Sequence, residues 1–534
     1  MMKNTKFLFV TGGVLSGLGK GVSAAALGRT LKARGFKVFV QKFDPYYNVD
    51  PGTMSPYQHG EVFVTTDGGE TDLDLGHYER FIGETLTKVS NYTQGKLLQE
   101  LLDEERRGVY EGKTIQVIPH VTDKIINKLY EAAKSSKADF IITEIGGTVG
   151  DIESQPFMQA IWEFSQINRH QSYFIHCAFL PFLETSEEFK SKPIQHSVKL
   201  LHSMGINPNM ILLRANQKIP EEIVEKVAKT TFVSRESCIP IPNVDNIYKL
   251  PIYFEKYKMA EIILKYFKMP ERPADLSGWQ KYIKLIDQPK KQTLTIAMVG
   301  KYVEFEDAYK SIVEALKISG NYNAVNIKLL WISSDVITKQ NVGKKIANVD
   351  GVIILPGFGK RGFDGKVIMA QYTRDHNIPT FGICYGFQAM VVAQAKLQGI
   401  SDATSSEVDQ EGSFVIDIIK GKNKHDNLGG TLRLGLSETK LVKNSLAAKL
   451  YGSLSSWERH RHRYETNPQY IEKIVTKDFV FSGFDANNGY AEVCEMPHQK
   501  FYLGVQAHPE FNANPLKEHP LFRGFIKAII KHKH

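Results

Sequence analysis

We expect an α/β protein of two domains, because three features of the sequence point to it. The chain has 534 residues, which is too long for one compact core. Its hydrophobic fraction of 42% and charged fraction of 23% are typical of a globular protein. Short β-rich runs alternate with helical patterns in the first half, and this alternation restarts near residue 294. Each half is therefore predicted to form a mainly parallel sheet covered by helices.

The elements follow from these runs in order. In the first half, strands are predicted at residues 7–10, 37–40, 139–143, 173–180 and 210–214, with a helix at 22–33. In the second half, strands are predicted at 294–300, 325–330, 351–355 and 379–383. Two prolines within residues 269–273 and a polar run at 287–292 place a linker at 270–293. The predicted domains are therefore residues 1–269 and 294–534.

Charge and cysteine content narrow the function classes. Lys and Arg exceed Asp and Glu by nine (67 against 58), and the surplus is spread along the chain, so nucleotides explain the positive charge as well as nucleic acid does. The 4 cysteines have no paired spacing, which argues against a disulfide framework or a zinc site. No apolar stretch is long enough for a signal-peptide core or a membrane span. We expect a cytoplasmic protein with no membrane partner.

A cysteine between two glycines predicts nucleophilic chemistry. Cys384 lies between Gly382 and Gly386, where an apolar run gives way to a helical pattern. Far downstream, His508 and Glu510 follow another apolar run. A thiol nucleophile needs a base, and the base needs an orienting carboxylate. A cysteine in such a place is more often a small buried residue, but the elbow context and the second segment favour a catalytic site.

The opposite end of the chain predicts a phosphate-binding loop. Residues 11–21 are glycine-rich and connect a strand to a helix, so backbone N–H groups and Lys20 would face an anion. Gly21 stands where a metal-binding Ser or Thr is usual, so a divalent cation needs carboxylates from elsewhere. The candidates are the pair Asp72 and Asp74, and Glu144 at the end of a predicted strand. A solvated acidic loop is the alternative for the pair.

Longer blocks resemble the CTP synthase family over essentially the whole chain. They are residues 16–21, 42–46, 48–56, 59–64, 70–81 and 144–154. The resemblance implies a P-loop-type parallel-sheet synthetase (amidoligase) domain at 1–269 and a class I glutamine amidotransferase domain at 294–534. Such enzymes phosphorylate the O4 of UTP with ATP and replace the phosphate by ammonia, which a Cys-His-Glu glutaminase releases from L-glutamine and a channel delivers. The blocks are specific to that family rather than to phosphate loops in general.

The resemblance also implies residue roles in the first half. ATP would be bound by Gly17, Leu18, Gly19, Lys20, Gly21, Val22, Lys42 and Asp74, and Mg²⁺ by Asp74 and Glu144. UTP, and CTP as product inhibitor, would be bound by Ser16, Asp151, Ile152, Glu153, Lys190, Ser191, Lys192, Pro193, Ile194, Gln195 and Lys226. The family often has Thr at the position of Ile194, so one hydroxyl contact is expected to be missing.

In the second half, the implied catalytic residues are Cys384, His508 and Glu510. Glutamine would be bound by Gly357, Tyr385, Gly386, Phe387, Gln388, Glu407 and Arg463. Arg459, Arg461 and Arg463 alternate and would share one face of an extended strand, and we favour Arg463 as the one that contacts glutamine. The ammonia channel would pass Pro56, His59 and Val62.

Three departures from the family pattern bear on activity. The oxyanion loop, defined here as residues 356–359, is one glycine short, and Tyr385 and Phe387 are bulkier than usual, so we expect a slower glutaminase. Comparing glutamine-dependent with ammonia-dependent turnover tests this. The resemblance assigns GTP activation to residues 106–108, but Val109 follows them where the family commonly has an acidic residue. A mobile lid is expected at 427–435. The family also implies a homotetramer, with filaments left open.

Two other functions remain to be weighed. One is a nucleotide-binding or filament-forming protein with a weakened glutaminase, which the intact Cys384, His508 and Glu510 disfavour. The other is a different ATP-dependent ligase, acting on a carbamate or carboxylate, which the fused glutaminase and residues 190–195 disfavour. CTP formation from UTP, ATP, Mg²⁺ and ammonium separates the three.

Overall fold

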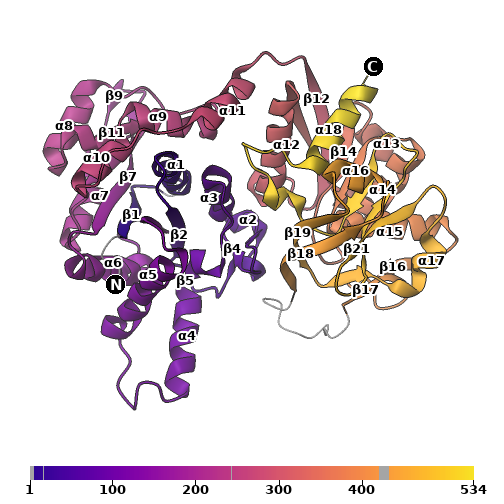
Figure 1. The fold of residues 1–534 in the computed structure, drawn as a ribbon, viewed down its shortest axis with the longest axis horizontal. Coiled ribbons are helices and arrows are strands. Elements are labelled where there is room, and N and C mark those ends of the chain that lie inside the picture. Colours follow the sequence, from indigo (N-terminus) through magenta and orange to yellow (C-terminus); the bar gives the residue numbers. More distant parts are fainter. Residues whose placement is uncertain (1–4, 16, 242, 420–431, 534) are drawn as a thin grey trace. The chain divides into compact units, whose positions relative to one another are not determined.

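The computed structural model describes residues 5–15, 17–241, 243–419 and 432–533. The chain forms two compact units, which can be followed by colour from indigo to yellow in Figure 1. The first comprises Met1–Pro51 and Asp74–Ile283, and the second comprises Gly52–Leu73 and Lys284–His534. The two-domain α/β fold class is confirmed.

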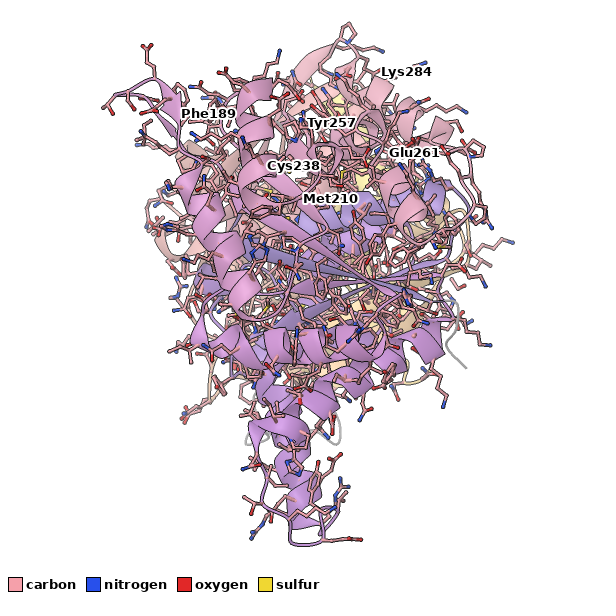
Figure 2. The ribbon with its side chains drawn as sticks, turned by 90° about the vertical axis from the view of Figure 1, so that its left-hand side faces the viewer. Phe189, Met210, Cys238, Tyr257, Glu261 and Lys284 are labelled. Atoms are coloured by element: carbon pink, nitrogen blue, oxygen red, sulfur yellow. The ribbon has the colours of Figure 1, made fainter. Side chains whose placement is uncertain are left out.

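The first unit is built on a seven-stranded parallel sheet with the order β11-β10-β7-β1-β6-β2-β5. Its strands are β1 (Lys6–Gly13), β2 (Val38–Asp44), β5 (Asn91–Thr93), β6 (Phe140–Ile145), β7 (Ser172–Phe179), β10 (Met210–Arg214) and β11 (Cys238–Ile241). The five predicted strands are confirmed, and both edge strands were missed. In Figure 2, Met210 and Cys238 mark the neighbouring starts of β10 and β11.

Alternating side chains of the central strands bury against helices on both faces. Phe7 and Phe9 of β1 pack with Phe164 of α6 (Gln155–Ile167) in one hydrophobic cluster, which also includes residues of α5 (Thr122–Ser136). On the other face, Ile142 of β6 approaches Gly28 of α1 (Lys20–Ala33), which confirms the predicted helix. The remaining helices are α3 (Asp74–Ile82), α4 (Gln94–Arg106), α7 (Lys192–Ser203), α8 (Glu221–Thr231), α9 (Leu250–Lys256) and α10 (Met259–Tyr266), and β8 (Phe182–Leu183) pairs with β9 (Glu188–Phe189).

The predicted linker contains a helix. Residues 277–287 form α11 (Ser277–Asp287), and its Trp279 and Tyr282 are buried against Tyr248. The Trp279 indole N–H also donates a hydrogen bond to the Tyr248 carbonyl at 2.6 Å. The polar composition of this stretch therefore reflects one face of an amphipathic helix, and most of the helix belongs to the first unit. The predicted linker thus includes a packed helix with two buried aromatic side chains, and its boundaries at 270–293 stay a prediction.

The second unit holds a nine-stranded mixed sheet with the order β13-β12-β14-β15-β23-β22-β21-β18-β19. The first five strands are parallel and the others join antiparallel. They are β12 (Gln292–Gly300), β13 (Val325–Ser333), β14 (Gly351–Ile354), β15 (Thr380–Ile383), β18 (Arg433–Leu441), β19 (Ser455–His462), β21 (Val480–Asp485), β22 (Ala491–Glu495) and β23 (Tyr502–Val505). The four predicted strands are confirmed, and all lie in the parallel part.

Helices and a small second sheet complete this unit. The helices are α12 (Lys310–Tyr322), α13 (Val342–Lys345), α14 (Phe363–Asp375), α15 (Tyr385–Leu397), α16 (Leu446–Tyr451), α17 (Ile471–Ile474) and α18 (Pro520–His532). The small sheet has the order β16 (Ala403–Ser405), β17 (Ser413–Ile418) and β20 (Tyr464–Thr466). Helix α15 is buried along nearly its whole length, so it forms the centre of this core. None of the helices in the described ranges is long and apolar enough to cross a membrane.

A segment of the first half packs inside the second unit. Gly52–Leu73 contains α2 (Pro56–His59), β3 (Phe63–Val64) and β4 (Glu70–Thr71). The buried Glu61 carboxylate accepts a hydrogen bond from the Ser311 N–H at 2.8 Å, near the start of α12. Arg459 of β19 donates to the Val64 carbonyl at 2.9 Å. We predicted this segment as part of a continuous domain 1–269. Its contacts with the second unit were missed because sequence order does not reveal tertiary contacts.

Candidate functional sites

Cys384 occupies a strained turn between β15 and α15. Its φ of 51° and ψ of −103° are rare for a residue with a side chain, and such strain is common where a nucleophile is presented. A Cβ on Gly386 would lie 2.0 Å from the Ile354 carbonyl oxygen, and one on Gly382 would lie 2.3 Å from the Met390 sulfur. The flanking glycines are therefore required by close packing, as the sequence indicated.

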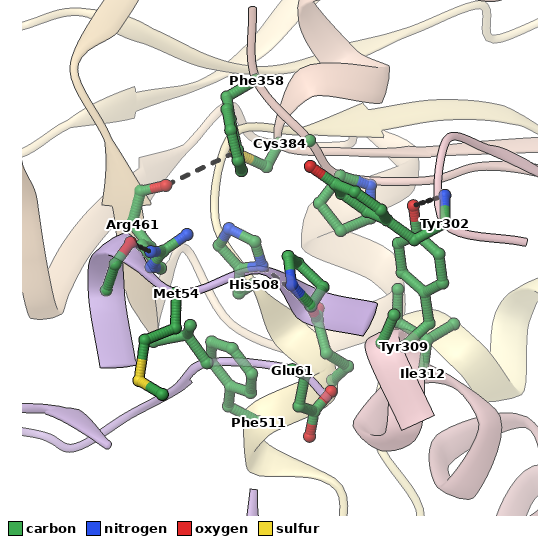
Figure 3. Close-up of a pocket in the computed structure, with 17 residues that line it drawn as sticks. Met54, Glu61, Tyr302, Tyr309, Ile312, Phe358, Cys384, Arg461, His508 and Phe511 are labelled. Carbon is green, nitrogen blue, oxygen red and sulfur yellow. Dashed lines mark hydrogen bonds and ion pairs between the residues drawn. The ribbon is translucent and has the colours of Figure 1, made fainter. Parts of the chain in front are cut away.

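The sheet order brings the base to the thiol. β15 pairs with β23 so that Ile383 lies opposite Val505, and the chains that leave the two strands carry Cys384 and His508. Figure 3 shows both side chains lining one pocket of the second unit. The Glu510 carboxylate lies 2.7 Å from Nδ1 of His508, which leaves Nε2 as the other ring nitrogen for the proton transfers of catalysis.

Electrostatics favour a protonated imidazole at this position. Burial alone would lower the pKa of His508, but the neighbouring Glu510 and Cys384 outweigh burial and raise this pKa to about 10. The Cys384 sulfur also lies 3.6 Å from the donating Nε2 of Gln506 and 3.8 Å from the Arg461 carbonyl oxygen. The protonated ring can then act as a general acid beside the thiol. Gln506 was not predicted, since an isolated glutamine in an apolar run carries no pattern.

The oxyanion loop lies beside the thiol. Gly357 and Phe358 line the pocket with Cys384. The Gly359 N–H donates to the Glu407 carboxylate at 2.6 Å, and the Tyr385 hydroxyl donates to the Gly359 carbonyl at 2.6 Å. Glu407 and Tyr385 thus both contact this loop, and the slower glutaminase inferred from its missing residue stays a prediction.

The three alternating arginines separate into two groups. Arg459 and Arg461 share a face of β19, as predicted, and both contact the segment Gly52–Leu73. Arg461 pairs with Glu70 at 2.8 Å and donates a hydrogen bond to the Gly52 carbonyl at 3.0 Å. Arg463 lies beyond the end of β19, so the shared face does not extend to it. Its charge helps to lower the pKa of Glu407, which burial chiefly raises. Arg461 lines the pocket that contains Cys384, and the choice of Arg463 for glutamine stays a prediction.

Two further residues assigned to glutamine lie in the core. Phe387 is fully buried in the main hydrophobic cluster of the second unit, and Gln388 donates to the Tyr464 carbonyl at 3.1 Å. Since both side chains are engaged inside the protein, their contribution to the site is limited to the backbone of the first turn of α15 and to support of the elbow.

Replacing Gly386 with alanine is expected to disrupt the elbow. The new Cβ would meet the Ile354 carbonyl at 2.0 Å, and overpacking of this kind costs about 1–3 kcal/mol. We expect a lower thermal unfolding temperature for the second unit and loss of glutamine hydrolysis. Calorimetry and glutamate release measure the two effects; an unchanged unfolding profile with full hydrolysis would contradict this packing argument.

In the first unit, the predicted phosphate loop connects β1 to α1. Gly17 and Gly19 have φ values of 71° and 78°. Because Gly19 is the N-cap of α1, the loop leads directly into the helix N-terminus, where the helix dipole favours an anion. The Lys20 ammonium donates to the Gly147 carbonyl, and its chain passes so close to Gly12 that a Cβ there would lie 2.6 Å from Lys20 Cδ. Leu18, Gly21 and Val22 also lie in this turn, whereas Ser16 lies outside the described residues.

Two carboxylates converge on Gly21. A Cβ at Gly21 would lie 2.3 Å from Asp74 Oδ1 and 3.1 Å from Glu144 Oε2, so the oxygens occupy the space where a serine or threonine side chain would stand. Burial and the nearby Asp74 raise the pKa of Glu144 to about 8, and the Tyr78 hydroxyl donates to Glu144. Lys42 pairs with Asp74 at 2.5 Å. Asp72, the other acid of the predicted pair, belongs to the second unit.

This donor set fits a magnesium ion. Two carboxylates and the phosphates of a nucleotide are the ligands that Mg²⁺ commonly uses, and waters complete its shell. The part of the chain that the structure describes contains no group of three or more His, Cys, Asp or Glu side chains suited to hold a metal by themselves. The close approach of the buried Glu144 carboxylate and the half-buried Asp74 carboxylate is the observation that calls for a cation here.

Most of the residues assigned to UTP lie on the loop after β6 and around the start of α7, whereas Lys226 lies in α8. Gly150 of that loop approaches Leu200 of α7, since a Cβ at Gly150 would lie 3.3 Å from Leu200 Cδ1. Asp151 accepts a hydrogen bond from the Thr148 N–H at 2.7 Å. The exposed residues of the set are Asp151, Ile152, Glu153, Lys192 and Lys226. The structure therefore brings the loop and the helix together.

Other members of that set have different surroundings. Lys190 pairs with Glu188, and Gln195 donates to the Ser191 hydroxyl at 3.1 Å, next to Lys192 and Pro193 at the start of α7. Ile194 is fully buried in a hydrophobic cluster. The Ile194 side chain therefore faces the core, and its assignment to the nucleotide site stays a prediction.

Known proteins match this chain over nearly its whole length. The family model "CTP synthase N-terminus" matches residues 6–269, and "Glutamine amidotransferase class-I" matches residues 304–528. The chain is 52% identical over 532 residues to a CTP synthase of Mycoplasmopsis pulmonis, with 99% of each chain covered. It is 49% identical to a CTP synthase of Mycoplasma mycoides, with 98% of this chain and 99% of that one covered. It is 44% identical to a CTP synthase of Bacillus subtilis, with 99% of each covered.

Proposed function

The chain belongs to the CTP synthase family and is an ATP-dependent, glutamine-hydrolysing ligase that aminates UTP to CTP, and we propose that Cys384, His508 and Glu510 release its ammonia. The observation that carries this proposal is the pairing of β15 with β23, which places the strained Cys384 beside a base already held by Glu510. A nucleotide-binding protein without catalysis and a ligase for another substrate are both disfavoured by the full-length match.

The proposed glutaminase works through a covalent thioester. The Cys384 thiolate attacks the side-chain amide carbon of glutamine, and the N–H groups of Gly357 and Tyr385 stabilise the oxyanion. His508 gives its proton to the amide nitrogen, so NH₃ leaves and a glutamyl thioester remains. His508 then accepts a proton from water, which attacks the thioester and releases glutamate. Glu407 would hold the ammonium group of glutamine and Arg463 its carboxylate.

The proposed synthetase site uses the first unit. The phosphate loop with Lys20 and Lys42 would neutralise the triphosphate of ATP while its terminal phosphoryl group moves to the O4 of UTP. Ammonia then attacks C4, and phosphate leaves with the oxygen. Asp74 and Glu144 would hold Mg²⁺, which neutralises phosphate charge when bound. UTP would be held by the loop after β6 and by the start of α7.

The remaining expectations from the family are proposals of the same kind. GTP would activate glutamine hydrolysis and CTP would inhibit the enzyme, with residues 106–108 and a lid at 427–435 involved, of which 427–431 lie outside the described residues. Ammonia would pass Pro56, His59 and Val62. The enzyme would be a cytoplasmic homotetramer, with filament formation open, and the domain limits 1–269 and 294–534 are retained with the segment Gly52–Leu73 as an exception.

One assay tests the proposed function. The protein is incubated with UTP, ATP and Mg²⁺, together with either glutamine or ammonium chloride, and CTP is quantified by chromatography. We expect CTP from both nitrogen donors. Absence of CTP with ammonium would rule out the synthetase, and CTP with ammonium alone would point to an inactive glutaminase.

Substituting Glu510 with glutamine is expected to shift the pH profile of glutamine hydrolysis. Glu510 is a main cause of the raised pKa of His508, so without this charge burial dominates and that pKa falls. His508 then loses its proton at lower pH, so the alkaline limb of kcat/KM moves from near pH 10 toward neutrality, and kcat falls on the order of 100-fold or more. Glu472→Gln, an exposed acid on α17, is the control. An unmoved alkaline limb would contradict the assignment.

Substituting Asp74 with asparagine is expected to weaken both reactions that make CTP. Loss of one of two oxygen ligands should raise the Mg²⁺ concentration needed for half-maximal activity and lower kcat on the order of 10- to 100-fold, with glutamine and with ammonium alike. Asp72→Asn is the matched comparison, because Asp72 is the neighbouring acid and lies in the other unit. Equal effects of Asp74→Asn and Asp72→Asn would contradict the assignment of Asp74 as a Mg²⁺ ligand.

A further inference from the structure

Buried side chains donate hydrogen bonds to the backbone carbonyl groups of the oxyanion loop and of Leu355, the residue before it. Lys366 of α14, whose side chain is fully buried, donates to the carbonyls of Leu355 at 2.5 Å and Pro356 at 3.2 Å. Lys301 donates to the carbonyl of Phe358, and the Tyr385 hydroxyl to that of Gly359. These bonds fix the direction of several successive peptide groups in a loop that has no regular secondary structure.

Fixing the Pro356 carbonyl also fixes the next N–H. In a planar trans peptide, the C=O and the following N–H point in opposite directions. The Pro356 carbonyl is directed at the Lys366 ammonium, so the Gly357 N–H must point away from Lys366. A Cβ at Gly357 would lie 3.3 Å from Lys366 Nζ, which shows how closely the loop rests on this side chain.

We propose that Lys366 is a positioning residue of the glutaminase, which aims the Gly357 N–H at the oxyanion formed on glutamine. The inference rests on the proposed function, in which Cys384 attacks glutamine. Lys366 touches neither the thiol nor the substrate in this account. It acts through the Pro356–Gly357 peptide, and Gly357 lines the same pocket as Cys384.

A lysine is a costly residue at this position, which supports a specific role. Burial, followed by the charge of Lys301, lowers the pKa of Lys366 to about 7, while Cys384, Glu407 and Asp335 act in the opposite direction. The ammonium also lies 5.0 Å from the centre of the Tyr385 ring. An apolar side chain would fill the same space without this desolvation, but it would leave two loop carbonyls without their donor.

Lys366→Met separates positioning from other roles. Methionine has a similar volume but cannot donate, so the Gly357 N–H loses its fixed direction. We expect kcat for glutamine hydrolysis to fall on the order of 10- to 100-fold with little change in KM, because a misplaced oxyanion donor weakens the transition state more than substrate binding. Ammonia-dependent CTP formation should be unchanged. Alkylation of Cys384 by iodoacetamide, followed by mass spectrometry of its peptide, should also be unchanged, because alkylation needs the thiolate but no oxyanion hole.

Three comparisons make the test decisive. Lys360→Met removes an exposed lysine that lies next to the same loop and pairs with Asp409. This variant should retain wild-type glutamine hydrolysis. An unchanged kcat in Lys366→Met overturns the inference, and so does a parallel fall of hydrolysis and alkylation, since Lys366 would then act on the thiol. If Lys366→Met does not fold, Lys366→Leu, which also lacks a donor, is measured instead, and the same outcomes decide. Cys384→Ala is assayed beside them: glutamine-dependent activity that survives it contradicts the proposed function, whereas its loss without an effect at Lys366 contradicts only this inference.

Discussion

Replacing Cys384 with alanine is expected to abolish CTP formation from glutamine and to leave CTP formation from ammonium unchanged. No other described cysteine can substitute, because Cys177, Cys238 and Cys494 lie outside the pocket that contains His508 and burial raises the pKa of each of these thiols well above its usual value. Without a nucleophile, no thioester forms, and we expect glutamine hydrolysis to fall on the order of 1,000-fold or more. The ammonium reaction needs only the nucleotide sites of the first unit.

The measurement is the rate of CTP formation with each nitrogen donor. Cys494→Ala is the matched control, since it removes a buried thiol from the same sheet without touching the pocket that contains Cys384. Substantial CTP formation from glutamine by Cys384→Ala would place the nucleophile elsewhere. Loss of the ammonium reaction in that variant would show that the substitution damages more than the glutaminase.

Replacing Lys20 with alanine is expected to lower CTP formation on the order of 100-fold or more with either nitrogen donor. Lys20 begins α1, at the helix N-terminus that faces the phosphate loop, and supplies a point charge there. A glutaminase defect would spare the ammonium reaction, whereas loss of phosphate stabilisation affects the step that both reactions share. The expected pattern is therefore opposite to that of Cys384→Ala.

Steady-state kinetics with ATP varied at saturating UTP and ammonium measure this effect. Lys32→Ala is the control, because Lys32 lies on the same helix but pairs with Glu84 at the surface. Wild-type kinetics in Lys20→Ala would contradict the assignment of the loop to ATP. So would a loss confined to glutamine-dependent activity.

Local patterns predicted the two reactive turns well. Close contacts leave no room for a Cβ at Gly382 and Gly386, whereas Gly17 and Gly19 before Lys20 have positive φ values, and both constraints leave a visible mark on the sequence. Most of the parallel strands were predicted because buried strands are nearly continuous apolar runs, although β5, β11 and β23 were missed. The antiparallel strands β18, β19, β21 and β22 contain many polar and charged residues, so they escaped notice.

Tertiary placement could not be predicted from these patterns. Gly52–Leu73 joins the second unit through Glu61, Glu70 and backbone carbonyls, and none of these groups has a periodic signal. The alternation of Arg459, Arg461 and Arg463 indicated one shared face, but the end of β19 at His462 removes the last arginine from it. Lys366 gave no signal either, because a single lysine in a helix is normally exposed.

Transfer of labelled nitrogen tests the central claim most directly. The wild-type enzyme is given UTP, ATP, Mg²⁺ and glutamine labelled with ¹⁵N in its side-chain amide, and the CTP formed is analysed by mass spectrometry. If Cys384 releases the ammonia that the first unit uses, the C4 amino group of CTP carries the label, and Cys384→Ala makes no labelled CTP. Glutamate release without labelled CTP, or labelled CTP from Cys384→Ala, would contradict the account.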